Sequence, residues 1–348
     1  MTKRFDGRDE PIIDPDIPII DCHHHLFDHP SLRYMFEEFP EDPQGGHRIV
    51  ASVFIEAKSF LRPDGPEVLR PLGEIEFANG VGAMSASGLY GDLRACAAIV
   101  GYADLRMGDQ IGWLLDRAMS TAPERLRGIR QIIMEHPSEA PYRFFFTGRP
   151  PSGTYNHPGF RDGLRQLALR GLTFEATGFH VQMPEIAKIA DAFPNMTVVL
   201  NHMTVAMGLD MGSEERKALF ADWREALRDI ARRPNVLCKI GGLGMPTWGF
   251  GFENRSQPVH SSELAEIWRP FVETAIEAFG TDRCMMESNF PPDARSCGYV
   301  PLWNALKTIV SGASTFEKAN LFYKTAARTY RIDLGTLKME NNPLETNG

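Results

Sequence analysis

No apolar run in this 348-residue chain approaches the ~20 residues that a membrane-spanning helix needs. The first residues, Met1–Asp6, also lack the apolar core of a secretory signal behind them. Cysteine is scarce, and the five residues show no paired spacing, so we expect reduced thiols and a cytoplasmic protein without membrane contact. Positive charge is not in excess: 37 basic residues face 45 acidic ones, and the net charge of −8 argues against a nucleic-acid partner.

Internal repeats, low-complexity tracts and linkers are also lacking, so we expect one domain over residues 1–348. An apolar fraction of 43 % and a charged fraction of 24 % are ordinary for a globular protein that buries a sizeable core. Two long segments, 57–93 and 135–159, are expected to be loop insertions in this domain. Loops of this length usually form lids or binding walls, although either could be a surface excursion or a contact in a homo-oligomer.

Short apolar runs alternate with helical patterns along the chain. Eight strands are predicted, at Ile19–Cys22, Ile49–Glu56, Cys96–Gly101, Gly128–Ile132, Leu172–Ala176, Thr197–Asn201, Val236–Ile240 and Cys284–Glu287. Helices are predicted at Gly108–Met119, Pro158–Leu169, Pro184–Phe193, Ser213–Arg232, Ser262–Phe279, Val300–Val310 and Ser314–Tyr330. The alternation favours a (β/α)8 TIM barrel of the α/β class. An open doubly wound sheet usually has a Gly-rich phosphate turn after its first strand, and here three histidines stand at that place.

The three histidines directly follow the apolar run that ends at Cys22. Side chains alternate along a strand, so His23 and His25 are expected to point to one face and His24 to the other. Two imidazoles on one face, at the carboxyl end of a buried strand, can bind one divalent metal ion. The alternative is an exposed polar turn with no functional role.

Polar side chains recur at the predicted strand ends, where the active sites of such barrels lie. They include Glu56, Arg130, His180, His202, Lys239, Glu287 and Asn289. The expected metal ligands are His23, His25, His180 and Glu287. Three nitrogens and one oxygen suit zinc or a similar ion. His202 either completes that shell or stands beside it as a proton donor or substrate ligand. Taken singly, His180 could instead cap the following helix, and His202 could be structural.

Five stretches of the chain together resemble one family. They are Ile20–Phe27, Gly128–Arg130, Leu200–His202, Asn235–Leu243 and Glu287–Pro291. In this combination the chain resembles the amidohydrolase superfamily (amidohydrolase family 2), and within it a lactonase-rich branch that includes 2-pyrone-4,6-dicarboxylate lactonase and sugar-acid lactonases. The resemblance implies a TIM-barrel hydrolase with one divalent metal, Zn²⁺ in the first instance, although some lactonases of this branch work without a metal.

Asn289 departs from the family pattern, which usually has aspartate at this position to activate water or bind metal. Asparagine cannot accept a proton at neutral pH and is a poor metal ligand. Glu287 on the same strand face or Asp293 in the following loop could replace the aspartate, and we favour Glu287 as the acid/base or ligand. The alternative is a structural Glu287 that pairs with Lys239 or Arg130.

Substrate contacts are expected from Arg130, Glu56, Trp248 and Phe250. An arginine fork binds a carboxylate bidentately, and a lysine such as Lys239 can hold an oxyanion. The loop 241–252, which mixes glycine with aromatic residues, and the run Phe144–Phe146 would form an apolar wall, unless they only pack within their own loops. The expected partner is therefore a small carboxylated molecule with an apolar or aromatic skeleton.

From these residues we predict an enzyme that opens a lactone or ester of a small organic acid with activated water. Glu287 or Asp293 would act as the general base, Arg130 would anchor a carboxylate, and His202 with Lys239 would stabilise the oxyanion. Two alternatives stay open. One is a non-oxidative decarboxylase or hydratase on the same scaffold, and the other is a catalytically silent barrel that only binds a ligand.

Overall fold

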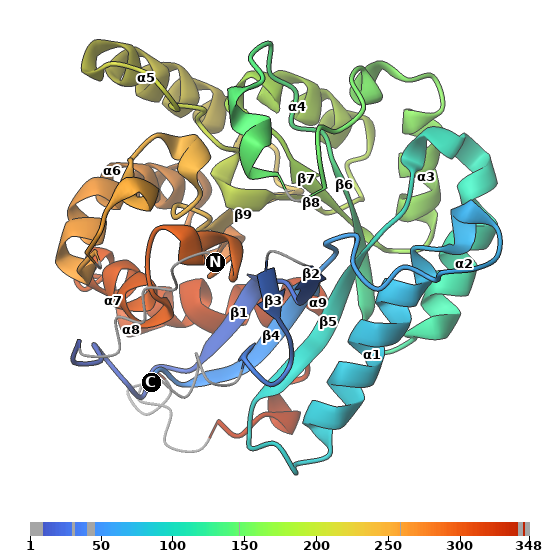
Figure 1. Cartoon of the computed structure of the whole chain (residues 1–348), viewed down its shortest axis with the longest axis horizontal. Helices are drawn as coiled ribbons and strands as arrows, with labels where there is room; N and C mark the ends of the chain where they lie inside the picture. Colours follow the sequence, from blue (N-terminus) through green and yellow to red (C-terminus); the bar gives the residue numbers. More distant parts are fainter. Residues whose placement is uncertain are drawn as a thin grey trace.

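Eight parallel strands form one sheet in the order β1-β4-β5-β6-β7-β8-β9-β10, with helices around it (Figure 1). The computed structural model describes residues 10–29, 32–39, 46–145, 147–257, 259–339 and 344. The strands are β1 (Ile19–His24), β4 (Ile49–Ile55), β5 (Arg94–Tyr102), β6 (Leu126–Ile132), β7 (Thr173–Thr177), β8 (Val198–Leu200), β9 (Val236–Ile240) and β10 (Cys284–Met286). Each predicted strand is therefore present, within one or two residues at either end.

The sheet closes at the histidine motif. A parallel bridge joins His24 to Phe290, just beyond β10. The backbone N–H of Asn289 donates to the carbonyl of His23 at 2.9 Å, and the N–H of His25 donates to the carbonyl of Phe290 at 2.8 Å. Neighbouring strands elsewhere pair in parallel register. The predicted TIM barrel is confirmed, and its seam brings the first and last strands of the site together.

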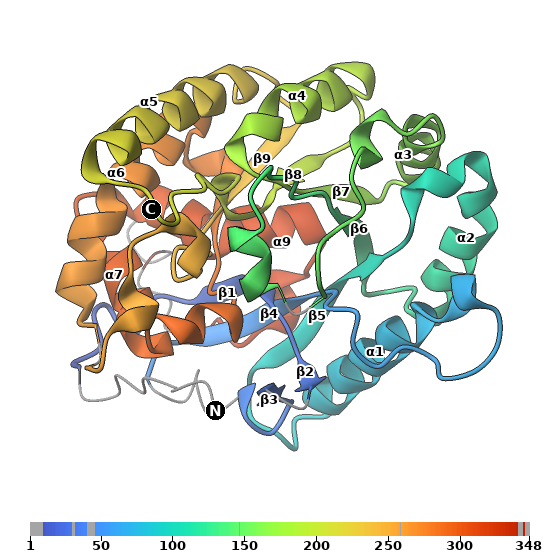
Figure 2. The ribbon, with the colours of Figure 1, turned by 45° about the horizontal axis from the view of Figure 1, so that its top comes forward.

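The helices surround the barrel in chain order, except the last one, which lies behind the centre of the barrel and whose Tyr330 donates to the interior Glu175 (Figures 1 and 2). They are α1 (Leu72–Ala86), α2 (Gly112–Thr121), α3 (Phe160–Leu169), α4 (Met183–Ala192), α5 (Ser213–Ile230), α6 (Ser261–Phe279), α7 (Tyr299–Ile309), α8 (Thr315–Ala319) and α9 (Thr325–Tyr330). A π-helical turn, Asn320–Lys324, joins α8 to α9 within the single helix that was predicted there. No helix among the described residues is long and apolar enough to cross a membrane.

The segment 57–93 is not the loop insertion that was predicted. It contains α1, which packs on β5 as one of the barrel helices. Apolar, small and acidic residues are spread around this helix, so it lacks the one-sided apolar stripe that reveals a surface helix. The alternation also fails between β1 and β4, where the described residues form a hairpin, β2 (Phe27–His29) with β3 (Leu32–Tyr34), in place of a helix.

The segment 135–159 is irregular, as predicted, with short 3-10 turns at Ala140–Phe144 and Thr154–Asn156. The hydroxyl of Tyr142 donates to the carbonyl of Met134 at 3.2 Å and accepts from the N–H of His136 at 2.6 Å. These bonds hold the segment to the end of β6. Phe146, one of the residues predicted for the apolar wall, lies outside the described residues.

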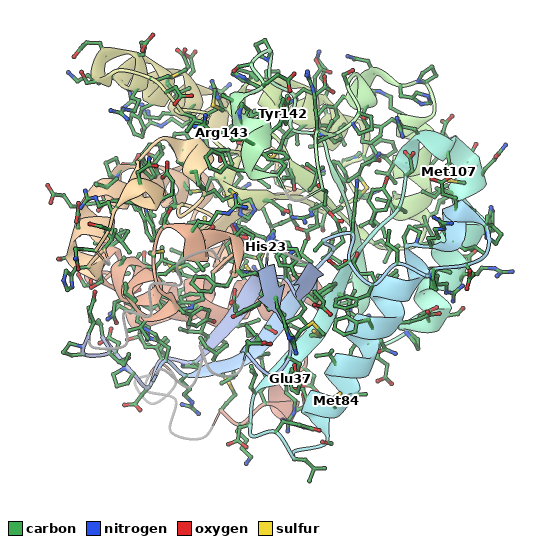
Figure 3. The ribbon with its side chains drawn as sticks, viewed as in Figure 1. His23, Glu37, Met84, Met107, Tyr142 and Arg143 are labelled. Carbon is green, nitrogen blue, oxygen red and sulfur yellow. The ribbon has the colours of Figure 1, made fainter. Side chains whose placement is uncertain are left out.

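The barrel interior carries charge as well as apolar side chains. Most residues of the eight strands are buried, as expected for a parallel sheet covered on both faces. Glu175 on β7, Lys239 on β9 and Glu287, which follows β10, have no exposed surface. Figure 3 places His23 near the middle of the barrel, whereas Met84 and Met107 lie at its outer edge. The candidate site is therefore built around the carboxyl ends of the strands and extends down into the core.

Candidate active site

The first strand presents its histidines as alternation predicts. The Nε2 atoms of His23 and His25 lie 3.2 Å apart. His24 faces the other way, where its Nε2 is 2.9 Å from the hydroxyl of Ser52 and its ring stacks on Phe39 at 4.2 Å between centroids. His23 and His25 therefore belong to the site, and His24 belongs to the packing behind it.

The hydrogen bonds of His25 fix its tautomer. Its Nδ1 lies 2.8 Å from the carbonyl oxygen of Ile55, which can only accept, so Nδ1 carries the proton. The lone pair on Nε2 then faces His23. Burial lowers the pKa of both imidazoles well below the usual value, so both rings are neutral. His23 has two possible tautomers. With the proton on Nε2, it donates to Nε2 of His25; with the proton on Nδ1, the Nε2 lone pairs of both rings are available to one metal ion.

Glu287 lies between two of the histidines. Its Oε1 is 2.5 Å from Nδ1 of His202, and its Oε2 is 2.9 Å from Nδ1 of His23, without the alignment of a hydrogen bond. Burial raises the pKa of Glu287 to about 8. Two glycines of the loop after β9 leave room for this contact, because a Cβ on Gly241 would lie 2.4 Å from Cγ of Glu287 and one on Gly242 would lie 2.4 Å from Nδ1 of His202.

The two buried cations pair with other carboxylates. Nζ of Lys239 is 3.0 Å from Oε2 of Glu175, and Nε of Arg130 donates to Oε1 of Glu56 at 2.8 Å. The alternative in which Glu287 pairs with Lys239 or Arg130 is therefore wrong. Neither cation forms an ion pair with Glu287, whose carboxylate contacts the imidazoles of His23 and His202.

Glu175 was missed in the sequence. It accepts from Nδ2 of Asn201 at 2.6 Å and from the hydroxyl of Tyr330 at 2.7 Å, besides its contact with Lys239. The available signal was a glutamate in the middle of β7, a strand buried along its whole length. A charged residue in such a strand needs a partner inside the barrel. Glu175 thus holds Lys239 and Asn201 beneath the histidines.

The donor atoms on His23 and His25 fit a metal ion. The two Nε2 atoms lie 3.2 Å apart, so both imidazoles could hold one divalent ion. Ligand atoms of His23, His202 and Glu287 also lie within 4.8 Å of one another. Nη1 of Arg130 lies 3.3 Å from Nε2 of His23, so it competes with a metal for that lone pair.

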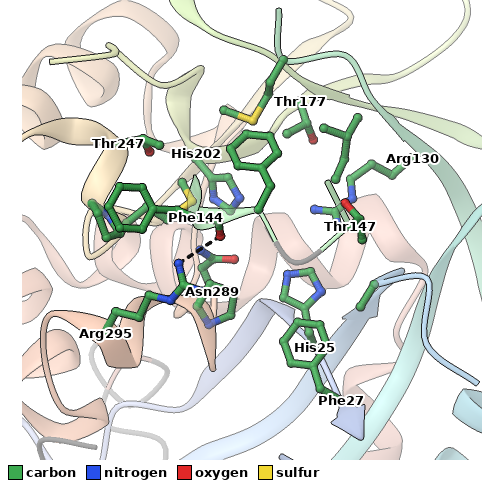
Figure 4. Close-up of a pocket in the computed structure, with 17 residues that line it drawn as sticks. His25, Phe27, Arg130, Phe144, Thr147, Thr177, His202, Thr247, Asn289 and Arg295 are labelled. Atoms are coloured by element: carbon green, nitrogen blue, oxygen red, sulfur yellow. Dashed lines mark hydrogen bonds between the residues drawn. The ribbon is translucent and has the colours of Figure 1, made fainter. Parts of the chain in front are cut away.

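A pocket opens above this cluster (Figure 4). Its polar lining includes His25, Arg130, His202 and Asn289, and Arg295 stands at its side. Its apolar lining is Phe27, Ala57, Ile132, Met134, Phe144, Phe145, Met245, Pro246 and Pro292. The structure thus brings four of the predicted site residues to one cavity. Glu56, Lys239 and Glu287 lie behind them in the barrel interior.

Other predicted residues do not reach the pocket. Trp248 donates from Nε1 to the carbonyl of Gly242 and stacks on Phe250, and both rings pack on Phe271. Met245, Pro246 and Thr247 of the same loop form the wall instead. His180 begins the 3-10 turn after β7, and its buried Nδ1 has no hydrogen-bond partner among the described residues. His180 is not among the residues whose ligand atoms lie within 4.8 Å of one another, which are His23, His202 and Glu287.

Asn289 and Asp293 hold each other. Nδ2 of Asn289 donates to Oδ1 of Asp293 at 2.7 Å, and the N–H of Gly244 donates to Oδ2 at 2.8 Å. Asn289 has a φ of 52°, a left-handed conformation that asparagine tolerates better than most residues. Asp293 accepts hydrogen bonds from these two donors and does not line the pocket. Glu287, the other residue proposed to replace the aspartate that the family usually has, instead contacts two histidines of the site.

Asn289→Asp is expected to destabilise the protein by about 1–3 kcal/mol, because two carboxylates would then meet where an amide now donates. Adding Asp293→Asn should restore most of that loss, since the donor and acceptor only exchange places. Chemical denaturation of the single and double variants measures both effects. A single variant as stable as the parent would contradict the pairing described here.

Comparisons with known proteins agree with this fold. A family model described as "Amidohydrolase" matches residues 20–332. The chain is 34 % identical over 339 residues to an uncharacterized protein, y4mH, of Sinorhizobium fredii. The aligned residues cover 91 % of this chain and 99 % of that one. It is 25 % identical over 325 residues to L-fucono-1,5-lactonase of Burkholderia multivorans, covering 90 % and 96 % of the two chains.

Solved structures share the fold at low sequence identity. An amidohydrolase of Burkholderia multivorans with bound zinc has a TM-score of 0.68 at 20 % identity, covering 90 % of this chain and 99 % of that one. A putative 2-pyrone-4,6-dicarboxylic acid hydrolase of Pseudomonas putida has a TM-score of 0.60 at 14 % identity, covering 91 % of this chain and 98 % of that one. A 5-carboxyvanillate decarboxylase of Sphingomonas paucimobilis has a TM-score of 0.55 at 12 % identity, covering 91 % of this chain and 100 % of that one. The family match and the 34 % identical relative, both spanning nearly the whole chain, show that this chain belongs to the amidohydrolase family.

Proposed function

We propose that this protein hydrolyses a lactone or ester of a small organic acid, with His202 as the general base that activates water. One observation carries the proposal: His202 lines the pocket while its Nδ1 contacts Glu287, 2.5 Å away. When Nδ1–H donates to the carboxylate, the lone pair on Nε2 is left to take a proton. Glu287 does not line the pocket, so it acts through His202 as a positioning residue and not as the direct base that was predicted.

The proposed reaction uses groups that already face the pocket. His202 takes a proton from water as the oxygen attacks the acyl carbon, and it returns the proton to the leaving alkoxide as the C–O bond breaks. Arg130 lines the pocket and places positive charge where the oxyanion forms. Lys239 does not line the pocket, so we no longer assign it to the oxyanion.

We propose that His23 and His25 hold a divalent metal, with the carboxylate of Glu287 2.9 Å and the ammonium of Lys239 3.5 Å from Nδ1 of His23. Metal-binding imidazoles usually donate their second nitrogen to a carbonyl or carboxylate, and Nδ1 of His25 already does so to Ile55. When bound, such an ion would supply Lewis acidity to the substrate carbonyl. The relative named L-fucono-1,5-lactonase, 25 % identical, supports the lactone class of substrate, and its own substrate is not assigned to this chain.

The test is proton balance on a panel of lactones and esters, with and without a carboxylate. We expect turnover to release one proton and no CO₂ for each molecule, because ring opening yields a hydroxy acid. Proton uptake with CO₂ release would instead support the decarboxylase, the activity named for one neighbour of similar fold. No turnover on any member of either substrate class would leave the silent binding barrel. Elemental analysis of the same preparation should find one equivalent of zinc or a similar ion.

A further inference from the structure

We propose that the side-chain oxygen of Asn289 accepts a hydrogen bond from a hydroxyl group of the substrate, and that Thr247 offers a second hydrogen bond in the same pocket. The substrate class that follows is a 2-hydroxy lactone or ester on a mainly apolar skeleton. Because this hydroxyl would lie in the pocket already described, its role rests on the proposed function. Asn289 was predicted among the catalytic residues, and Thr247 was not among the predicted site residues.

The amide of Asn289 is oriented from behind. Its Nδ2 donates to Oδ1 of Asp293 at 2.7 Å, which leaves the amide oxygen on the other side. Figure 4 shows this oxygen turned into the pocket. No described residue donates a hydrogen bond to it. An amide oxygen can only accept, so the group of a ligand that it meets must be a donor.

Thr247 is a second polar group of the lining without a partner. It belongs to the 3-10 turn Pro246–Trp248, which the indole of Trp248 holds to the carbonyl of Gly242 at 2.9 Å. The side chain is 2 % exposed, and its Oγ1 is buried with no hydrogen-bond partner among the described residues. A buried hydroxyl without a partner is unfavourable. A change of its χ1 rotamer would turn this hydroxyl to a ligand in the pocket.

The other two threonines of the lining differ from Thr247. Thr177 donates to Oδ1 of Asn201 at 2.9 Å, so its proton is already used. Thr147 is exposed, so water can bind to it. Among the uncharged polar residues of the described lining, Asn289 and Thr247 are therefore the two that gain most from a polar group on the ligand.

The donor that fits Asn289 is a neutral hydroxyl. The described lining has two arginines and no aspartate or glutamate, so it offers an ammonium group no counter-charge. The backbone N–H of Asn289 donates to the carbonyl of His23 at 2.9 Å, which places this residue beside the histidines of the site. A hydroxyl held there would lie next to the carbonyl that reacts. The remaining lining is mostly apolar, which favours an apolar skeleton for the rest of the molecule.

The experiment compares pantolactone, as separate enantiomers, with its deoxy analogue β,β-dimethyl-γ-butyrolactone by ligand-observed NMR titration. The two lactones differ only in the 2-hydroxyl group, and NMR detects binding and ring opening in the same sample. We expect one enantiomer of pantolactone to bind about tenfold more tightly than the deoxy lactone, because the latter leaves the amide oxygen of Asn289 buried without a donor.

Variants of the two residues assign this preference. Asn289→Gly should remove it, and glycine adopts the φ of 52° at this position without strain. Asn289→Asp combined with Asp293→Asn should keep it, since a carboxylate oxygen then replaces the amide oxygen. Thr247→Val should lower it about threefold, whereas Thr247→Ser should retain it. Thr177→Val is the matched control, because it removes a pocket hydroxyl that already donates to Asn201, and the preference should not change.

The proposal is overturned if the parent has no preference, if it binds neither lactone at millimolar concentration, or if Asn289→Gly keeps the preference. No preference, with an equal loss of turnover on both lactones in Asn289→Gly, would assign the amide to the attacking water instead. Thermal melting of each variant checks folding. If Asn289→Gly does not fold, loss of the preference in the double variant, or an unchanged preference in Thr247→Val, overturns the proposal. Selective binding without ring opening would leave this inference standing and count against the hydrolase alone.

Discussion

His202→Asn is expected to lower kcat by about 10³-fold, with KM changed little. General base catalysis contributes roughly 10²–10⁴-fold, and asparagine removes the nitrogen that faces the pocket. The side-chain amide of asparagine can still hydrogen-bond to Glu287, which Nδ1 of His202 now contacts at 2.5 Å, so the fold should survive. Steady-state kinetics on the best lactone of the panel measures the loss. A decrease of less than tenfold would mean that His202 is not the base.

The same pair predicts that the pH–rate profile has an acid limb, on which activity falls as the pH drops below about 8. Burial raises the pKa of Glu287 to about 8. Below that pH the protonated carboxyl donates to Nδ1 of His202, which leaves the imidazole proton on Nε2, and the base is blocked. Above it the carboxylate accepts from Nδ1–H and Nε2 is free. Activity should therefore rise as the pH passes through about 8 and fall below it.

Two controls follow from the same assignment. Glu287→Gln should remove the limb, because the amide does not titrate. Nδ1 of His23 lies 2.9 Å from Glu287, so a divalent ion bound to His23 would lower the pKa of that carboxyl. Zinc-loaded protein should therefore show the limb at lower pH than chelator-treated protein. A limb that persists in Glu287→Gln would assign the titration to another group.

Much of the site could be predicted because it depends on local rules. Alternation along the first strand was enough to bring His23 and His25 together and to send His24 into the packing. Buried parallel strands must be apolar on both faces, so runs such as Ile49–Ile55 identified all eight strands. The carboxyl-end rule for barrels then placed Arg130 and His202 at one pocket.

The pairings inside the barrel could not be predicted in the same way. Lys239 pairs in register with Met285 of β10, two residues before Glu287, yet its side chain meets Glu175 on β7. Which of the two carboxylates it meets depends on the tilt and stagger of the strands, which no short-range pattern reveals. The aromatic loop shows the same limit. Trp248 was expected at the pocket, but its large apolar surface is satisfied equally well by packing on Phe271, which is where it lies.

Lys239→Met is expected to lower the free energy of unfolding by about 3–5 kcal/mol, because removal of one partner leaves the other buried and uncompensated. Both side chains of the Lys239–Glu175 pair have no exposed surface, and their charged atoms are 3.0 Å apart. Lys188→Met is the matched control. Its pair with Glu185 is closer, at 2.6 Å, but exposed, so the loss should be about 0.5 kcal/mol or less. Urea denaturation of both variants measures the difference.

Adding Glu175→Gln to Lys239→Met should recover more than half of that loss. The glutamine oxygen can still accept from Asn201, which now donates at 2.6 Å, and neither member of the pair then carries a charge. Activity separates the two roles that Lys239 could have. An oxyanion donor would cost about 10²–10³-fold in kcat when removed, whereas a lysine behind the pocket should cost less than about tenfold once the double variant restores stability. A stable double variant with a large loss of kcat would return Lys239 to the catalytic groups.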